Sequence, residues 1–155
     1  KLTGFIPVSI CTLPNLKVLM LDRNILSGEL PPQIGKLSML ENLSLYENSL
    51  QGQLPVSFYE LKSLKSVSLY SNRFTGKLSP AIGNLVLLEN LNLFDNDFKG
   101  QVPLELEKLT HLKKMNISYN LFSGLVSNRL SLLDKLNMTM RNEVGNVVSL
   151  PVIKG

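Results

Sequence analysis

Apolar and polar residues recur along this chain with a period of 24 residues. A glycine column and an asparagine column show the period most directly. The glycines are Gly4, Gly28, Gly52, Gly76, Gly100 and Gly124, and the asparagines are Asn24, Asn48, Asn72, Asn96 and Asn120. Several apolar columns keep the same spacing. Chance does not align this many columns, so internal repeats organise the chain.

The apolar positions within one unit predict a β-strand followed by a return segment. One unit reads Leu40-x-x-Leu43-x-Leu45-x-x-Asn48-x-Leu50-x-Gly52-x-Leu54-Pro55. The alternation of Leu43 and Leu45 has the period of a strand with one buried face. A single strand cannot bury that face alone, so successive units should stack with their strands about 4.8 Å apart. These strands should be parallel, because each one returns after a crossover of roughly twenty residues.

The polar and special residues of the unit suit the turns of such a stack. An asparagine at a chain reversal can bond backbone groups that the turn leaves unpaired, so the asparagine column should form a ladder. A glycine suits a position with positive φ or close backbone approach. Most units start the return with a proline that fixes φ, namely Pro7, Pro31, Pro55 and Pro103. The fourth unit carries Ser79 and then Pro80, which predicts an altered turn there.

Other apolar columns are expected to face the interior. Phe74, Phe98 and Phe122 stand where earlier units carry Leu26 and Leu50, so these rings should belong to the core. The return segments carry a second inward set, namely Ile34, Ile82, Leu106, Leu37, Leu85 and Leu109. Cys11 is the single cysteine, so no disulfide forms within the chain, and a free, partly buried thiol is expected there.

The repeat resembles the plant-type extracellular leucine-rich repeat. The resemblance rests on segments such as Leu26-Ser27-Gly28-Glu29-Leu30-Pro31, followed by Ile34-Gly35. It implies an α/β solenoid: a right-handed, curved array with a parallel sheet on the concave side and short 3-10 or irregular segments on the convex side. The family occurs in plant receptor-like kinases, in receptor-like proteins and in polygalacturonase inhibitors. Its members bind peptides, steroids or proteins, usually on the concave sheet or beside it.

The pattern covers residues 1–133, about five to six units, and it starts in the middle of a repeat. Lys1-Leu2-Thr3-Gly4 aligns with Arg73-Phe74-Thr75-Gly76, so we expect the chain to be a fragment of a longer protein. Beyond residue 133 the pattern fails, as polar residues replace apolar ones and a valine replaces asparagine at Thr139, Arg141 and Val144. The paired cysteines that typically close the family's repeats are also missing. Residues 134–155 are therefore a degenerate repeat or an atypical C-terminal tail.

The residues that flank the strand leucines should point to the concave face. Tyr46, Tyr70 and Phe94 occupy one column in three successive units, and Tyr119 lies one place off it in the next. Nothing in the scaffold requires aromatic residues there. They predict a stacking surface for a ligand, in which the three rings line up along the sheet. Adjacent rings could equally stack only on each other and stabilise the sheet, and the sequence leaves both interpretations open.

Polar residues beside these rings complete the predicted binding surface. Asn90, Asn92 and Asn116 should offer paired donors and acceptors to an extended peptide. Glu47, Asp95 and Lys114 should set a charge preference at its rim. Three glycosylation sequons begin at Asn42, Asn116 and Asn137, and they add little weight by themselves.

Composition removes several other classes of function. The net charge of +4 comes from 16 basic and 12 acidic residues that are scattered along the chain, which does not indicate nucleic-acid binding. No apolar run approaches the length of a membrane span, so any membrane attachment lies in segments outside these residues. The single histidine, His111, is expected to be solvated, and no metal or catalytic motif is present. We therefore expect neither an enzyme nor a cofactor.

The sequence thus predicts a recognition module rather than a catalyst. The resemblance implies the ectodomain of a plant receptor-like kinase or receptor-like protein, with a peptide or protein ligand and a co-receptor as partners. It also implies the secretory pathway and a place at the extracellular face of the plasma membrane or in the cell wall. A soluble inhibitor of a cell-wall enzyme, of the polygalacturonase-inhibitor type, is the alternative. The ligand cannot be named, because the scaffold leaves the surface residues free to vary.

Overall fold

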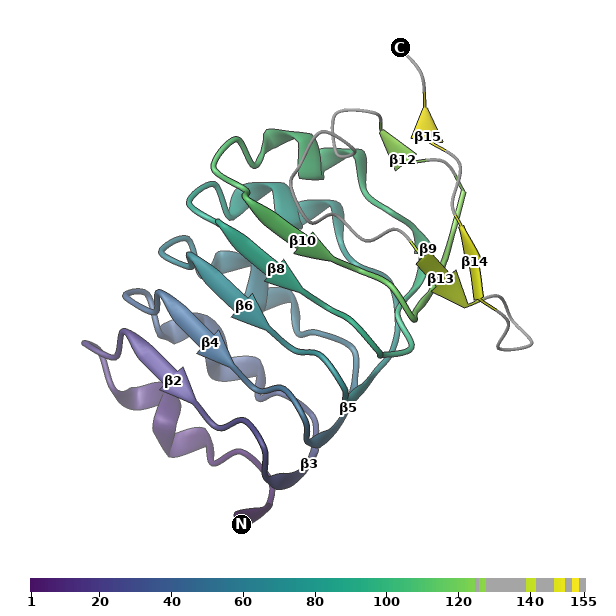
Figure 1. The fold of residues 1–155 in the computed structure, drawn as a ribbon. Coiled ribbons are helices and arrows are strands. Elements are labelled where there is room, and N and C mark those ends of the chain that lie inside the picture. The colour runs from purple at the N-terminus through teal and green to yellow at the C-terminus, as the bar shows by residue number, and fades with distance from the viewer. Residues whose placement is uncertain (125, 128–138, 142–146, 150–151, 154–155) are drawn as a thin grey trace.

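The computed structural model describes residues 1–124, 126–127, 139–141, 147–149 and 152–153. Each repeat forms one turn of the solenoid, called a coil below, and successive coils stack on each other. One strand of each coil joins a five-stranded parallel sheet in the order β10-β8-β6-β4-β2 (Figure 1). The strands are β2 (Val18–Met20), β4 (Asn42–Ser44), β6 (Ser66–Ser68), β8 (Asn90–Asn92) and β10 (Lys114–Asn116). Residues one repeat apart pair directly, as Leu19 does with Leu43. The predicted solenoid with its stacked parallel strands is confirmed.

A second set of short parallel strands follows the turn of each coil, and the sequence pattern did not predict it. β1 (Thr3–Gly4), β3 (Ile25–Gly28), β5 (Ser49–Gly52) and β7 (Arg73–Phe74) form one sheet. β9 (Lys99–Gln101) and β11 (Leu121–Ser123) form another, and a bridge between Lys77 and Lys99 links the two sheets. The glycine column lies in these strands or within two residues of their ends, with φ between 77° and 86°, as at Gly28 and Gly124, which confirms its predicted positive φ.

The return segments form short 3-10 helices on the side opposite the five-stranded sheet (Figure 1). They are η1 (Val8–Thr12), η2 (Pro32–Lys36), η3 (Val56–Glu60), η4 (Pro80–Asn84) and η5 (Leu104–Lys108). The altered turn expected at Ser79 is wrong, because Ser79 (φ −68°, ψ 145°) adopts nearly the backbone angles of Pro31 (φ −63°, ψ 139°). The Ser79 hydroxyl also accepts a hydrogen bond from the Ala81 backbone at 3.0 Å.

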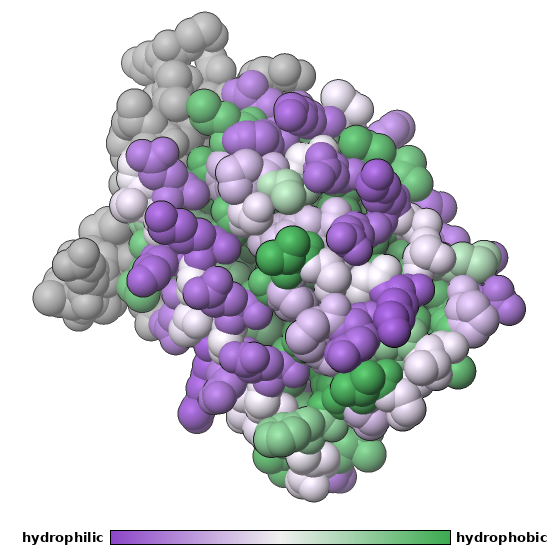
Figure 2. Space-filling model, turned by 180° about the vertical axis from the view of Figure 1, so that it is seen from behind, coloured by the Kyte–Doolittle hydropathy of each residue, from purple (hydrophilic) through white to green (hydrophobic). Residues whose placement is uncertain are grey.

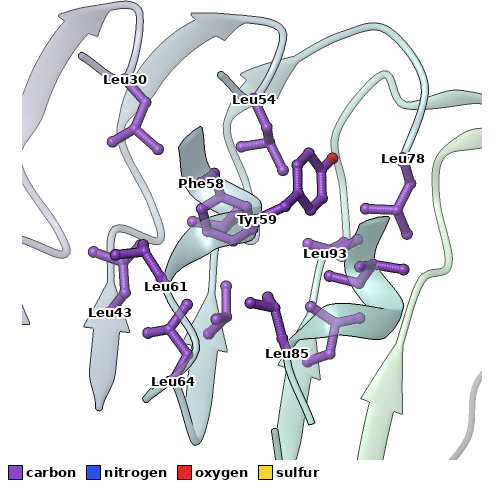
Figure 3. Close-up of a cluster of buried hydrophobic side chains, with 14 of the residues drawn as sticks. Leu30, Leu43, Leu54, Phe58, Tyr59, Leu61, Leu64, Leu78, Leu85 and Leu93 are labelled. Atoms are coloured by element: carbon purple, nitrogen blue, oxygen red, sulfur yellow. The ribbon is translucent and has the colours of Figure 1, made fainter. Parts of the chain in front are cut away.

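Ser79 introduces a backbone N–H that a proline would lack, and Tyr59 satisfies it. The N–H donates to the Tyr59 hydroxyl at 3.1 Å. The Tyr59 ring is buried among apolar side chains such as Leu54 and Leu78 (Figure 3), and this burial raises the pKa of its hydroxyl. The serine in one coil and the tyrosine in the coil before it therefore act together, since neither polar group is left unpaired.

The core runs the length of the stack between the sheet and the 3-10 helices. Most residues of the inward columns are buried as predicted, including the return-segment residues Ile34, Leu37, Ile82, Leu85, Leu106 and Leu109, whereas Leu16 and Leu21 of the first coil are only partly buried. The Phe74 ring stacks on Phe98 with centroids 6.1 Å apart, and Phe98 stacks on Phe122 at 6.2 Å. These three rings are core, as expected. Cys11 is free as predicted, but it is buried rather than partly buried, because the first 3-10 helix packs it into the interior.

The described pieces beyond residue 124 pair differently from the repeats. β12 (Val126–Ser127) pairs with β15 (Val152–Ile153) in parallel, whereas β13 (Thr139–Arg141) and β14 (Val147–Ser149) pair antiparallel. An antiparallel pair has no counterpart in the described repeats, whose strands pair in parallel. The predicted boundary near residue 133 and the sequon at Asn137 lie outside the described residues.

Candidate functional site

The asparagine column holds the turn that ends each strand of the five-stranded sheet. Asn72 Oδ1 accepts from the Leu50 backbone N–H at 3.0 Å. Asn72 Nδ2 donates to the Leu45 and Leu69 backbone carbonyls at 2.9 and 3.1 Å. One side chain thus ties its own turn to the coil before it. The same bonds recur at Asn48, Asn96 and Asn120, and Asn24 accepts from Leu2 and donates within its own turn.

The residue before each asparagine has a left-handed backbone. Its φ lies between 55° and 58° in every described coil, at Arg23, Glu47, Ser71, Asp95 and Tyr119. None of these residues is glycine, and such a conformation costs on the order of 1–3 kcal/mol at a non-glycine position. The bonds of the asparagine column hold the turn in place. The candidate binding residues Glu47, Asp95 and Tyr119 therefore stand on a rigid, repeated turn rather than on a loose loop.

The first aromatic pair of the concave face carries charged neighbours. The Tyr46 and Tyr70 rings stack with centroids 4.4 Å apart and planes 7° from parallel. The Arg23 guanidinium lies 5.6 Å from the centre of the Tyr46 ring, and its Nε atom donates to Glu47 Oε2 at 3.1 Å. Arg23 thus bonds a carboxylate and a ring of the next coil at the same time. We did not single out Arg23 from the sequence, although its opposite charge one repeat before Glu47 was a readable signal.

Ionisation in this pair follows from burial and from the neighbouring groups. Partial burial raises the pKa of Tyr70, and the adjacent Tyr46 and Glu47 raise it further. The pKa of Arg23 lies above its ordinary value because of Tyr46 and Glu47. At neutral pH Tyr70 is therefore a neutral phenol, and the nearby Arg23 guanidinium is charged.

The second aromatic pair has a different geometry. Phe94 and Tyr119 meet edge to face, with centroids 5.2 Å apart and an interplanar angle of 67°. Tyr70 stacks on Tyr46, and the described residues include no ring contact between Tyr70 and Phe94. The rings therefore form two pairs instead of the single row expected from their spacing. The reason is that Tyr119 sits one residue later in its unit than Phe94, so its ring reaches Phe94 from the turn.

The asparagines of the concave face use part of their bonding capacity within the protein. Asn92 Oδ1 accepts from the Phe94 backbone at 3.1 Å, and Asn116 Oδ1 accepts from the Ser118 backbone and hydroxyl at 3.1 and 2.6 Å. The Asn90 amide donates to the Ser66 hydroxyl at 3.2 Å. The predicted donors and acceptors of these three side chains are therefore partly used within the protein. Asn116 has no acceptor capacity left on its oxygen, and its amide N–H groups are what it can offer.

Charged residues lie on both sides of the rings. Lys114 is exposed at the end of the five-stranded sheet, and Asp95 Oδ2 accepts from the Ser71 hydroxyl at 3.1 Å. An alternating charge column precedes the strands, namely Lys17, Glu41, Lys65, Glu89 and Lys113. Lys65 pairs with Glu41 at 3.4 Å and Lys113 with Glu89 at 3.2 Å. These pairs are exposed and stabilise little.

The two sequons within the described residues lie on the five-stranded sheet. Asn42 and Asn116 are half-buried, while the hydroxyl residues of their motifs, Ser44 and Ser118, are buried. The Ser44 hydroxyl donates to Asp22 Oδ1 at 3.1 Å. A glycan on either asparagine would occupy the concave face, so glycosylation and ligand binding would compete for the same surface.

The groups that could carry other chemistry are dispersed. Within the described part of the chain, no three His, Cys, Asp or Glu side chains gather as a metal site would require. His111 is exposed, and burial raises the pKa of the Cys11 thiol above its usual value, which keeps it protonated. None of the described helices has the length and apolar character needed to cross a membrane.

The face opposite the five-stranded sheet has a mixed surface. Figure 2 shows hydrophobic residues there as separate patches among hydrophilic ones. Val56 and Leu104 are exposed apolar residues at the starts of η3 and η5, and each is the first residue of its helix. Leu104 lines a shallow pocket with Glu105, Glu107 and Lys108, and neither residue lies beside an aromatic cluster like those of the concave face, which therefore remains the candidate binding surface.

Comparisons with known proteins agree with this architecture. A family model described as a leucine-rich repeat region matches residues 6–147. The chain is similar to the ectodomain of the Arabidopsis thaliana receptor kinase GASSHO1/SCHENGEN3, solved with CASPARIAN STRIP INTEGRITY FACTOR 2. The identity is 34% over 80% of this chain and 15% of that chain, with a TM-score of 0.77. It is also similar to the Arabidopsis receptor kinase HAESA, solved with the peptide hormone IDA and the co-receptor SERK1. There the identity is 31% over 96% of this chain and 26% of that chain, with a TM-score of 0.81.

A third similar structure has a different role. It is a plant ice-binding protein, with 27% identity over 91% of this chain and 45% of that chain and a TM-score of 0.79. The chain thus spans between 15% and 45% of these three proteins. No curated protein sequence matches the chain significantly.

Proposed function

The chain belongs to the leucine-rich repeat family, and on that basis we propose that it is a recognition module of a plant receptor ectodomain that binds a peptide ligand through its concave face. Two of the similar structures are receptor kinases, and HAESA is solved with a peptide hormone and a co-receptor. The ectodomain role places the protein at the extracellular face of the plasma membrane, with a co-receptor as a second protein partner. Membrane attachment and signalling belong to other segments of such a receptor.

The observation that carries the proposal is the two pairs of aromatic rings on the concave face, at positions where the repeat fold does not require aromatic residues. Tyr46, Tyr70 and Phe94 follow the ends of their strands, outside the buried columns, and Tyr119 is exposed. Aromatic rings supply large contact area at low entropic cost, and the amides of Asn92 and Asn116 can donate to the backbone of an extended peptide. Glu47, Asp95 and Lys114 add charge at the rim.

The fold alone does not decide between ligands. The ice-binding neighbour shows that this solenoid also serves a partner other than a peptide. The concave columns of this chain change chemistry from coil to coil, as from Val18 through Asn42 and Ser66 to Lys114. A surface that varies in this way suits a heteropolymer such as a peptide, whose successive side chains also differ. A soluble cell-wall enzyme inhibitor would use the same face, but no contact among the concave residues favours that alternative.

A footprinting experiment tests the proposal. The chain is panned against a displayed library of random heptapeptides, and the selected peptides are added before hydroxyl-radical oxidation of the side chains. We expect peptides to protect Tyr46, Tyr70, Phe94 and Tyr119. Phe5, which is 74% exposed outside the concave face, and Leu104 serve as internal controls and should keep their reactivity. Protection at Leu104 with unchanged concave rings would place the binding surface elsewhere and refute the proposal.

A further inference from the structure

One arginine of the concave face, Arg23, is held by a carboxylate and an aromatic ring. Arg23 contacts two residues of the following coil: its Nε atom bonds Glu47 Oε2 at 3.1 Å, and its guanidinium lies 5.6 Å from the centre of the Tyr46 ring. The carboxylate supplies charge and a hydrogen bond, and the ring supplies a face for the planar cation. Tyr70 stacks on Tyr46 and supports that ring.

Two coils further on, the same pair of partners recurs without the arginine. Phe94 stands at the repeat position of Tyr46, and Asp95 stands at that of Glu47. Tyr119 contacts the Phe94 ring, as Tyr70 contacts that of Tyr46. The position of Arg23 is taken by Ser71, whose short side chain bonds Asp95 Oδ2 at 3.1 Å, as Arg23 bonds Glu47. The left-handed turn has φ of 56° at Ser71, as at Arg23, and 58° at Asp95.

The two carboxylates therefore differ in their charge balance. Glu47 is neutralised by Arg23, while the bond that Asp95 receives comes from a neutral hydroxyl. Within the described part of the chain, Asp95 has no cation at ion-pair distance. Asp95 and Phe94 stand at the repeat positions of Glu47 and Tyr46, the two residues that Arg23 contacts. Asp95 thus keeps an uncompensated negative charge beside an aromatic ring.

We propose that Asp95 and Phe94 form a subsite for an arginine side chain of the bound peptide, which takes there the place that Arg23 takes beside Glu47 and Tyr46. This inference rests on the proposed peptide-binding function and names one residue type that the peptide carries. The guanidinium is preferred over a lysine ammonium, because a planar cation stacks on a ring while it bonds a carboxylate. Ser71 permits the subsite because its side chain is too short to fill it.

Synthetic peptides that differ in one side chain test the subsite. The probes are acetyl-Ala-Ala-Arg-Ala-Ala-amide and its counterparts with lysine and with citrulline, a neutral group of nearly the same shape as arginine. Binding is followed by NMR from the ring resonances of Phe94. We expect saturable shifts with the arginine peptide at millimolar concentration, and weaker binding of the lysine and citrulline peptides. Asp95→Asn should weaken the arginine peptide about tenfold, the loss of one charge-assisted hydrogen bond, and leave the citrulline peptide unchanged.

Two further variants make the experiment specific. Glu29→Gln removes a carboxylate of the same charge from an exposed position outside the concave face, and it should leave the affinity for the arginine peptide unaltered. Ser71→Arg supplies the missing arginine from the protein itself, so it should pair with Asp95 and abolish the preference for the arginine peptide.

The outcomes separate this inference from the proposed function. An arginine peptide that fails to shift the Phe94 ring, or that binds equally to Asp95→Asn, overturns the arginine subsite. If library-selected peptides still protect the concave rings in that case, the peptide-binding function stands without it. If those peptides protect no concave ring, the proposed function fails as well.

Discussion

The buried columns and the concave columns of this solenoid repeat with the same period but behave differently. The asparagine column is identical in every described coil, and each member makes nearly the same hydrogen bonds. The first concave column, by contrast, runs Val18, Asn42, Ser66, Asn90 and Lys114. A buried side chain must fit the coils before and after it, so stacking dictates its identity. An exposed side chain is not confined between the coils before and after it, and that freedom is what allows one scaffold to carry a specific surface.

The concave face itself shows the same contrast on a smaller scale. Its backbone is as regular as the interior, with left-handed turns within 3° of each other in φ. Its rings nevertheless form one stacked and one edge-to-face pair. Regular backbone with irregular side chains is the arrangement expected of a rigid recognition surface. If this division is right, changes to the interior should alter stability and changes to the concave face should alter binding.

The largest effect is expected from the phenylalanine column of the core. Phe74→Ala removes a ring that is buried between neighbouring coils and stacked on Phe98, which should cost about 3–5 kcal/mol in the free energy of unfolding. Urea unfolding followed by circular dichroism measures it. Phe5→Ala is the matched control, because that ring is exposed and its loss should change stability by less than about 0.5 kcal/mol. Similar losses for both variants would show that burial in the stack does not set stability.

A smaller effect is expected from the asparagine column. Asn72→Ala leaves the Leu50 N–H and the Leu45 and Leu69 carbonyls without their partner, at a cost of about 1–3 kcal/mol. Asn24→Ala should cost less, because that residue is more exposed and bonds within its own turn and to Leu2. Unfolding midpoints of both variants against the parent protein test the order. A midpoint for Asn72→Ala equal to that of the parent would remove the structural role of the ladder.

A further small effect on stability is expected at Ser79, which stands where other coils carry a proline. Tyr59→Phe removes the acceptor of the Ser79 N–H and should cost about 1 kcal/mol. Adding Ser79→Pro to that variant removes the unpaired N–H and restores the residue that other coils use at this place, as in Pro31–Pro32. We expect the double variant to recover part of the loss in thermal unfolding. A double variant that is less stable than Tyr59→Phe would contradict the assigned link between the two residues.

The parts of the structure that follow from stacking could be predicted from the sequence. The parallel strands, the core columns and the place of the asparagines each depend on residue type at a fixed spacing, as Leu43, Leu45 and Asn48 illustrate. The second set of strands was missed, because its strands are only two to four residues long and many of their residues, such as Ser49 and Gln51, are neither apolar nor β-branched. The altered turn predicted at Ser79 was wrong, because a turn without proline can keep the same backbone angles when a neighbouring side chain accepts a hydrogen bond from its N–H.

The details of the candidate site were harder to predict. Ring pairing depends on side-chain rotamers, which the spacing of Tyr70 and Phe94 does not encode. The internal bonds of Asn92 and Asn116 depend on the local turn geometry. The pairing of Arg23 with Glu47 was readable in principle, because opposite charges one repeat apart are neighbours in the stack. Opposite charges at the same position of successive repeats therefore predict ion pairs between neighbouring coils, as apolar columns predict core contacts.

The central claim, that the concave rings bind rather than merely stabilise, is tested most directly by measuring both quantities on Tyr70→Ala. The ring is half-buried and stacks on Tyr46, so its removal should lower the free energy of unfolding by about 0.5–1.5 kcal/mol. The affinity for a heptapeptide selected on the parent protein should fall by more, about 2 kcal/mol or roughly 30-fold, as for a central aromatic anchor. An unchanged affinity together with a lowered unfolding midpoint would show that the rings only stack on each other, and it would contradict the account.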